Sequence, residues 1–131
     1  MIDFDGPIND VNNRYYMVHQ KVCEILNFKS TLSNSEYWNL KVNFPQIFFY
    51  KIKLPVNKIN DYKYNWNCLI EDDYYLSYDK IHPFARLDLI ELANIYSLWL
   101  VSLRKNFIEA RNTLDRYGIS NIFQNIFFFK T

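Results

Sequence analysis

The stretch Asp3-Phe4-Asp5-Gly6-Pro7-Ile8-Asn9-Asp10 begins two residues after the N-terminus and decides how the rest of the chain is interpreted. It predicts a very short strand that runs into a Gly-Pro turn, because glycine and proline are the strongest local breakers of regular structure. Asp3 and Asp5 would point to opposite faces of a continuing strand, but a turn beginning at Gly6 can bring both to the strand's carboxyl end. In open α/β sheets, ligands bind at that end. The spacing therefore allows a site that uses both carboxylates, although solvated residues near a loose terminus have the same spacing.

Apolar residues at helical spacing predict that the middle of the chain is mainly helical. The first helix is expected over residues 11–26, where a polar residue directly before it can act as the cap. Two further helices are expected over residues 33–40 and 58–71. The aromatic stretch 47–50 lies between two prolines and is expected to be irregular.

The last third of the chain predicts alternating helices and strands. A helix is expected after Pro83, and the apolar run 98–101 is typical of a buried parallel strand. A second helix should begin at Asn106 and stop at Gly118, which suits the left-handed residue at a helix C-terminus. A final strand over residues 126–129 would complete a βαβ unit with parallel pairing. The side chains expected to face inward from the second helix are Ile108, Ala110 and Leu114.

The composition indicates one compact unit with a hydrophobic core, in which a lobe could be inserted, and it excludes several classes of protein. Of 131 residues, 50% are hydrophobic and 19% aromatic, which is enough to bury such a core. The net charge is +1 with both signs interspersed, so no field of one sign is available for nucleic acid or an anionic membrane. Cys23 and Cys68 stand alone, which gives little support to a zinc site or disulfides and favours the cytoplasm. No signal peptide is evident, and no apolar run approaches the ~20 residues of a spanning helix.

The quoted N-terminal stretch resembles the signature DxDGTLxD of the haloacid dehalogenase superfamily, and Pro7 is its one departure. The likeness continues at Ser102, which follows the apolar run 98–101 and matches the Ser/Thr of that family's second motif. Residues 106–123 look like the helix, glycine and phenylalanine that come next in many members. The resemblance therefore covers essentially the whole chain, although its specific part is about ten residues.

The resemblance implies an α/β fold with a Rossmann-like core and an inserted α-helical cap. Residues 1–10 and 81–131 would form the core, and residues 11–80 would form the cap. The chain ends before the family's third and fourth motifs are evident, which predicts a C-terminally truncated member with an incomplete parallel sheet. The strand that carries Asp3 is then expected at an edge, where it could pair with another chain.

What the resemblance implies about function is magnesium-dependent phosphatase activity on a small phosphorylated metabolite. Asp3 would be the nucleophile that forms an aspartyl-phosphate, and it would also be a Mg²⁺ ligand. Asp5 would serve as general acid and base and as a second metal ligand, partly through its backbone carbonyl. Ser102 would hydrogen-bond a phosphoryl oxygen.

Three further residues are candidates for substrate binding under the same resemblance, namely Gly6, Lys105 and Lys130. Lys130 lies slightly early for the family's motif lysine, and no acidic residue follows it. The expected partner is a small phosphorylated metabolite, with no nucleic acid or membrane. A second copy or a partner chain could also cover the open sheet edge.

Two other interpretations remain open from the sequence. The chain could be a non-catalytic remnant, or one half of a split protein that needs a partner chain. Carbon–halogen hydrolysis on the same aspartate fits less well, because the DxDG pattern with Ser102 is more typical of the phosphate branch.

The two histidines and the many aromatic residues favour structural roles. His19 is expected to be a packed, hydrogen-bonded residue of the core or its rim. His82 precedes Pro83 and is expected to face solvent. The aromatic residues of the middle segment favour the core of a cap over a platform for a sugar or base.

Overall fold

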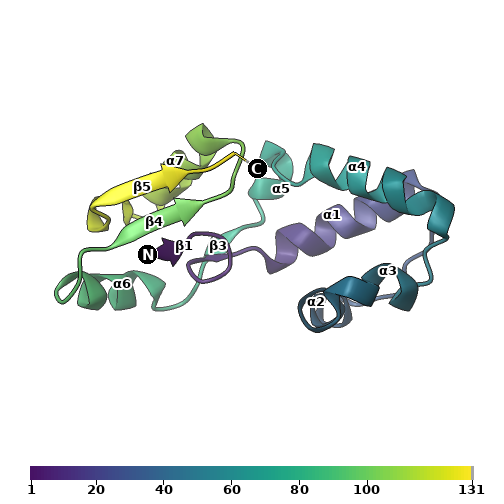
Figure 1. Cartoon of the computed structure of the whole chain (residues 1–131), viewed down its shortest axis with the longest axis horizontal. Helices are drawn as coiled ribbons and strands as arrows, with labels where there is room; N and C mark the ends of the chain where they lie inside the picture. Colours follow the sequence, from purple (N-terminus) through teal and green to yellow (C-terminus); the bar gives the residue numbers. More distant parts are fainter. Residues whose placement is uncertain (131) are drawn as a thin grey trace. The chain divides into compact units, whose positions relative to one another are not determined.

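A computed structural model describes residues 1–130, which form two compact units. The first unit combines residues 1–11 with the chain from residue 80 onward, and the second consists of residues 12–79. The first contains every strand of the described residues, whereas the second is helical (Figure 1). The candidate catalytic residues therefore belong to the first unit.

The first unit contains a parallel sheet of three strands, in the order β1 (Ile2–Asp3), β4 (Trp99–Ser102) and β5 (Asn125–Phe128) (Figure 1). Within residues 1–130, β1 is an edge strand, as the sequence predicts. Val101 of β4 pairs with Asp3 of β1, and Ser102 pairs with Phe128 of β5. This register brings Asp3 and Ser102 to the carboxyl end of the sheet. The unit also contains a two-stranded antiparallel sheet, in which β2 (Asn9–Asp10) pairs with β3 (Lys80–Ile81).

Two helices flank β4 in the chain, α6 (Ala85–Ala93) and α7 (Phe107–Arg116). The side chain of Asn106 caps α7 by accepting a hydrogen bond from the backbone N–H of Glu109. Gly118 follows α7 with φ of +68°, which confirms the predicted left-handed stop. Together, β4, α7 and β5 form the predicted βαβ unit.

The prediction for the inward face of α7 is wrong at one position. Ala110 and Leu114 are fully buried, but Ile108 is 65% exposed. Residues two apart on a helix lie about 200° apart around its axis, so Ile108 and Ala110 cannot share a face. In α6, Ala85 and Leu89 are buried, whereas Leu87 is 57% exposed. The core of this unit consists of Phe4, Ile8, Leu89, Leu98, Leu100, Ala110, Leu114, Ile119 and Phe123.

The second unit confirms the three predicted helices with small shifts at their ends. They are α1 (Asn12–Ile25), α2 (Asn34–Asn43) and α4 (Ile59–Leu69), and two shorter helices are α3 (Phe48–Lys51) and α5 (Asp73–Leu76). The aromatic stretch 47–50 is helical where irregular structure was expected: a 3₁₀ turn at Pro45–Ile47 leads directly into α3. The physical reason is that proline fits the first turn of a helix, and that Phe48 is buried against Tyr37 and Tyr62.

Aromatic side chains fill the core of the second unit. His19 is fully buried in it, with Nδ1 2.7 Å from the Tyr62 hydroxyl and Nε2 2.9 Å from the Ser30 hydroxyl. The prediction of a packed, hydrogen-bonded histidine is therefore confirmed. The buried residues of this core are Val18, Val22, Cys23, Tyr37, Phe48, Leu54, Tyr62 and Tyr75.

Cys23 is buried and Cys68 is exposed, and neither forms a disulfide. The longest apolar helical segments among residues 1–130 fall short of what is needed to cross a membrane.

Candidate functional site

A tight turn at the end of β1 positions the two aspartates. Phe4 lies between them and is fully buried, so it anchors the backbone while Asp3 is exposed. The Phe4 N–H donates to the carbonyl of Val101 at 3.1 Å, and the Phe4 carbonyl accepts from Asn9 N–H at 3.0 Å. Gly6 occupies the turn with φ of +106°, a conformation that residues with a Cβ rarely adopt. The chain therefore folds back directly after Asp5.

The carboxylate of Asp5 is held by Arg104, a residue to which the sequence analysis assigned no role. Arg104 donates from Nε to Oδ2 at 2.9 Å and from Nη2 to Oδ1 at 2.7 Å, which is a bidentate ion pair. The Arg104 side chain is only 3% exposed and lies over the Phe4 ring, 4.9 Å from its centroid. A bidentate pair fixes the direction of a carboxylate as well as its position. Arg104 thus sets the orientation of Asp5.

Asn9 also belongs to this network around Asp5. Its Nδ2 donates to Asp5 Oδ1 at 2.9 Å, and its Oδ1 accepts from the Tyr117 hydroxyl at 2.7 Å. Asn9 is completely buried, so both bonds are shielded from water. The motif asparagine therefore connects the turn after β1 to the end of α7.

Ser102 lies at the end of β4, one strand away from Asp3. Its side chain is buried, and its Oγ accepts a hydrogen bond from the backbone N–H of Arg104 at 3.2 Å. A hydroxyl that accepts one bond can still donate its own proton to an oxygen acceptor. The structure thus gathers Asp3, Asp5 and Ser102 at the carboxyl ends of two paired strands.

His82 is only partly exposed, and it makes hydrogen bonds that the sequence did not predict. Its Nε2 lies 2.7 Å from the carbonyl oxygen of Gly6, to which it donates. Its backbone N–H also donates to the carbonyl of Ile8 at 2.9 Å. These two bonds tie the turn after β1 to the chain that follows β3. No local pattern around His82 indicated this role, because its partners lie more than 70 residues earlier in the chain.

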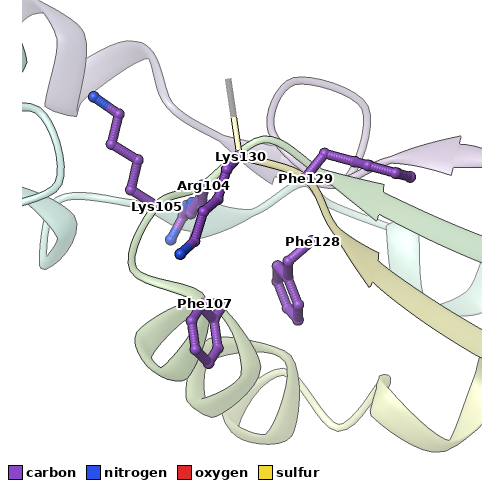
Figure 2. Close-up of a pocket in the computed structure, with 6 residues that line it drawn as sticks. All are labelled: Arg104, Lys105, Phe107, Phe128, Phe129 and Lys130. Carbon is purple, nitrogen blue, oxygen red and sulfur yellow. The ribbon is translucent and has the colours of Figure 1, made fainter.

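Lys105 and Lys130 line a pocket of about 270 Å³ at the carboxyl ends of β4 and β5. In Figure 2, Arg104 and Lys130 lie near the rings of Phe107 and Phe128, while the Lys105 side chain extends away from them. The rings of Phe107 and Phe128 are in contact, with centroids 6.0 Å apart. The pocket therefore combines positive charge with an aromatic floor. Its lining residues are Arg104, Lys105, Phe107, Phe128, Phe129 and Lys130.

The residues at this end of the sheet can supply some of the ligands of a divalent cation. Within residues 1–130, no group of three or more His, Cys, Asp or Glu residues is arranged to hold a metal ion. Both carboxylate oxygens of Asp5 already accept hydrogen bonds from Arg104, and one also accepts from Asn9. The Asp3 carboxylate and the Asp5 carbonyl remain as candidate donors. Mg²⁺ is commonly held by one or two carboxylates together with water and substrate phosphate.

Several solved structures resemble this chain over nearly its whole length. A hydrolase of the haloacid dehalogenase-like family from Streptococcus pneumoniae superposes with a TM-score of 0.70 at 16% identity, covering 98% of this chain and 59% of that protein. A protein named as a candidate phosphatase from Clostridium difficile gives 0.69 at 18% identity, with the same two coverages of 98% and 59%. A candidate hydrolase of this class from Bacillus subtilis, solved with bound magnesium, gives 0.51 at 14% identity and covers 96% of this chain and 62% of that one.

No protein-family model matches the sequence, and no curated protein matches it at a significant level. The chain spans about three fifths of the length of the Streptococcus and Clostridium proteins, since it covers 59% of each. With identities between 14% and 18%, the likeness concerns the path of the backbone. The parallel sheet, the aspartate turn after β1 and these superpositions agree, and the chain therefore has the fold of the haloacid dehalogenase-like hydrolases.

Proposed function

We propose that this chain is a magnesium-dependent phosphatase that acts on a small phosphorylated metabolite through an aspartyl-phosphate. The observation that carries the proposal is the grouping of Asp3, Asp5 and Ser102 at the carboxyl ends of β1 and β4, within a haloacid dehalogenase-like fold. Two of the similar structures are named as a hydrolase and a candidate phosphatase, which favours phosphate chemistry.

In this proposal, the exposed carboxylate of Asp3 attacks phosphorus and the bond from phosphorus to the leaving oxygen breaks. Ser102 donates its hydroxyl proton as a hydrogen bond to a phosphoryl oxygen. Asp5, whose carboxylate is held by Arg104 and Asn9 in the structure, is proposed to give a proton to the leaving oxygen and later to take one from the attacking water. Water then releases inorganic phosphate and restores Asp3.

Magnesium, when bound by the Asp3 carboxylate and the Asp5 carbonyl, would neutralise negative charge on the phosphate. The Bacillus structure, which was solved with magnesium, supports this choice of ion. Gly6, Lys105 and Lys130 are proposed to contribute to substrate binding, the two lysines through the pocket at the ends of β4 and β5. A cap role for residues 12–79 and a cytoplasmic location belong to the same proposal.

A second candidate is a non-catalytic domain that needs a partner chain or a second copy. The observation in its favour is that β1, which carries Asp3, is an edge strand in the described sheet. An open edge presents unpaired backbone groups on which another strand can add. Mg²⁺-dependent turnover by the purified chain separates the two candidates, because the second candidate has no catalytic activity of its own.

The test of the phosphatase proposal is hydrolysis of an aryl phosphate by the purified chain, with and without Mg²⁺. Turnover should require the ion and disappear in Asp3→Asn. The matched control is Asp88→Asn, which removes an exposed carboxylate from α6 and should leave turnover unchanged. A folded monomer without Mg²⁺-dependent turnover, or equal turnover in Asp3→Asn, would overturn the proposal.

A further inference from the structure

A second pocket, of about 240 Å³, lies within the helical unit of residues 12–79. It is formed by side chains from α2, α3 and α4, and none of them has a role in the proposed phosphatase chemistry. Its volume lies below the ~300–1,000 Å³ of typical pockets for drug-sized molecules, so a single-ring ligand is the appropriate scale. The residues that line it are Lys41, Phe49, Tyr62, Lys63, Trp66 and Asn67.

The wall of this pocket is aromatic and held in place by the core. Tyr62 and Trp66 lie one turn apart on α4 and stack with centroids 6.1 Å apart and an interplanar angle of 16°. Phe49 meets the Tyr62 ring edge-on at 5.1 Å. The Tyr62 hydroxyl is engaged by His19 at 2.7 Å, so the ring of Tyr62, and not its hydroxyl, is what a ligand would meet. A preformed wall of this kind suits offset or edge-to-face contact with another aromatic ring.

Two lysines bring positive charge to the same pocket. Lys41 Nζ lies 4.7 Å from the centroid of Trp66 and 5.5 Å from that of Phe48, and Lys63 Nζ lies 5.9 Å from that of Phe49. Neither lysine forms a salt bridge with a carboxylate anywhere in the part of the chain that the structure describes. Burial lowers the pKa of Lys41, which reflects the cost of keeping an ammonium away from water. An anion in the pocket would offset that cost.

We propose that this pocket binds a small aromatic carboxylate, a single ring that bears one carboxylate group. The ring would lie against Trp66 and Phe49, and the carboxylate would accept charge-assisted hydrogen bonds from Lys41 and Lys63. The exposed amide of Asn67 adds a neutral donor at the rim. A cation would be repelled by both ammonium groups, and a neutral ring would leave them without a counter-charge. The site is independent of Asp3 and of the proposed phosphatase activity.

Trp66 provides an internal reporter for the test. The chain has three tryptophans, so a chain carrying Trp38→Phe and Trp99→Phe leaves Trp66 as the sole tryptophan. Benzoate is the probe, acetate is the anion without a ring, and benzamide is the ring without a charge. Saturable quenching by benzoate is expected, with affinity at least about tenfold above that for either comparison compound, because each of them lacks one of the two interactions. Chemical-shift changes in the unmodified chain provide the same comparison if the double substitution impairs folding.

Substitutions of single lysines localise the binding. Lys41→Met and Lys63→Met should each weaken benzoate binding about tenfold, since each removes one charge-assisted bond. Lys29→Met is the matched control, because Lys29 is exposed in the same unit and does not line the pocket, and it should bind as the parent does. Asp3→Asn should also bind unchanged, which separates this site from the phosphatase proposal. Equal quenching by acetate or benzamide, or unchanged affinity in both pocket variants, would overturn the inference.

Discussion

Lowering the pH from 7 to 4 should destabilise the helical unit of residues 12–79, because its core holds His19 in the neutral state. The ring is completely buried and is stacked on Tyr37 with centroids 4.7 Å apart. Burial, and secondly the positive charge of Lys41, lower the pKa of His19 from 6.5 to about 4. The unfolded chain has an ordinary histidine at this position, which takes up its proton near pH 6.5.

The direction and size of the effect follow from these two pKa values. Between pH 6.5 and about 4, the unfolded state binds more protons at His19 than the folded state does. The free energy of unfolding therefore falls as the pH drops through this window, and the contribution levels off below a pH of about 4. Each unit of pKa difference corresponds to about 1.4 kcal/mol, so the total loss is about 3 kcal/mol.

The other titratable groups that face the His19 ring do not change charge in this window. They are Cys23 on the same helix, Tyr37 and Lys41 on α2, and Tyr62 on α4. Burial raises the pKa of Cys23 to about 11 and raises the pKa of both tyrosines further still, so all three remain neutral. Lys41 remains positive in acid. The difference in pH dependence between the parent and a variant without His19 can therefore be assigned to His19.

The assay is urea unfolding followed by tryptophan fluorescence at several pH values between 4 and 7, with His19→Gln as the comparison. Glutamine can still hydrogen-bond but does not titrate, so the difference in unfolding free energy between the two proteins should change by about 3 kcal/mol across the window. Lys41→Met should reduce that change, since it removes one of the two causes of the lowered pKa. Identical pH dependence in the parent and His19→Gln would refute the reasoning.

Three further substitutions test local features by the same unfolding assay. Arg104→Met should lower the free energy of unfolding by about 2 to 3 kcal/mol, because the carboxylate of Asp5, which is only 24% exposed, loses its cation. An unchanged free energy of unfolding would mean that the ion pair adds no stability. Gly118→Ala should lower the free energy of unfolding by about 1 kcal/mol, because alanine is strained at the φ of +68° that Gly118 adopts. A steric clash does not contribute, since the atom nearest to the added Cβ is 3.5 Å away. Ser33→Ala should cost about 1 kcal/mol, since Ser33 forms a capping box with Glu36 at the start of α2; an unchanged midpoint would contradict this.

Local sequence patterns predicted the secondary structure correctly where the conformation depends on residues close together in the chain. Residues 106–118 show this, because the cap at Asn106, the helix between and the left-handed Gly118 depend only on nearby backbone groups. The same holds for the helices predicted at 11–26 and 58–71. The inward face of α7 was less predictable, because Ile108 and Ala110 are both apolar and only packing decides which one is buried.

The residues of the candidate site also fall into two groups, those that the sequence indicated and those that only the structure identified. Asp3, Asp5 and Ser102 could be singled out from the sequence, because they match the aspartate motif and the Ser/Thr motif of the family that the chain resembles. Arg104 could not be singled out, although it lies only two residues after Ser102. Its role depends on a partner 99 residues away in the chain. The link from His82 to Gly6, and the link from Tyr117 to Asn9, are long-range in the same sense.

The sequence by itself determined the longer helices and the strands β1, β4 and β5, the place of the tight turn after β1, and the two carboxylates that precede that turn. These features depend on backbone preferences and on apolar spacing that act over a few residues. Only the tertiary structure decided that Arg104 and Asn9 orient Asp5, that His19 is kept neutral, and that Lys41 and Lys63 converge on one aromatic pocket. Such contacts depend on side chains from distant segments and on the exclusion of water between them, and neither is visible in local sequence.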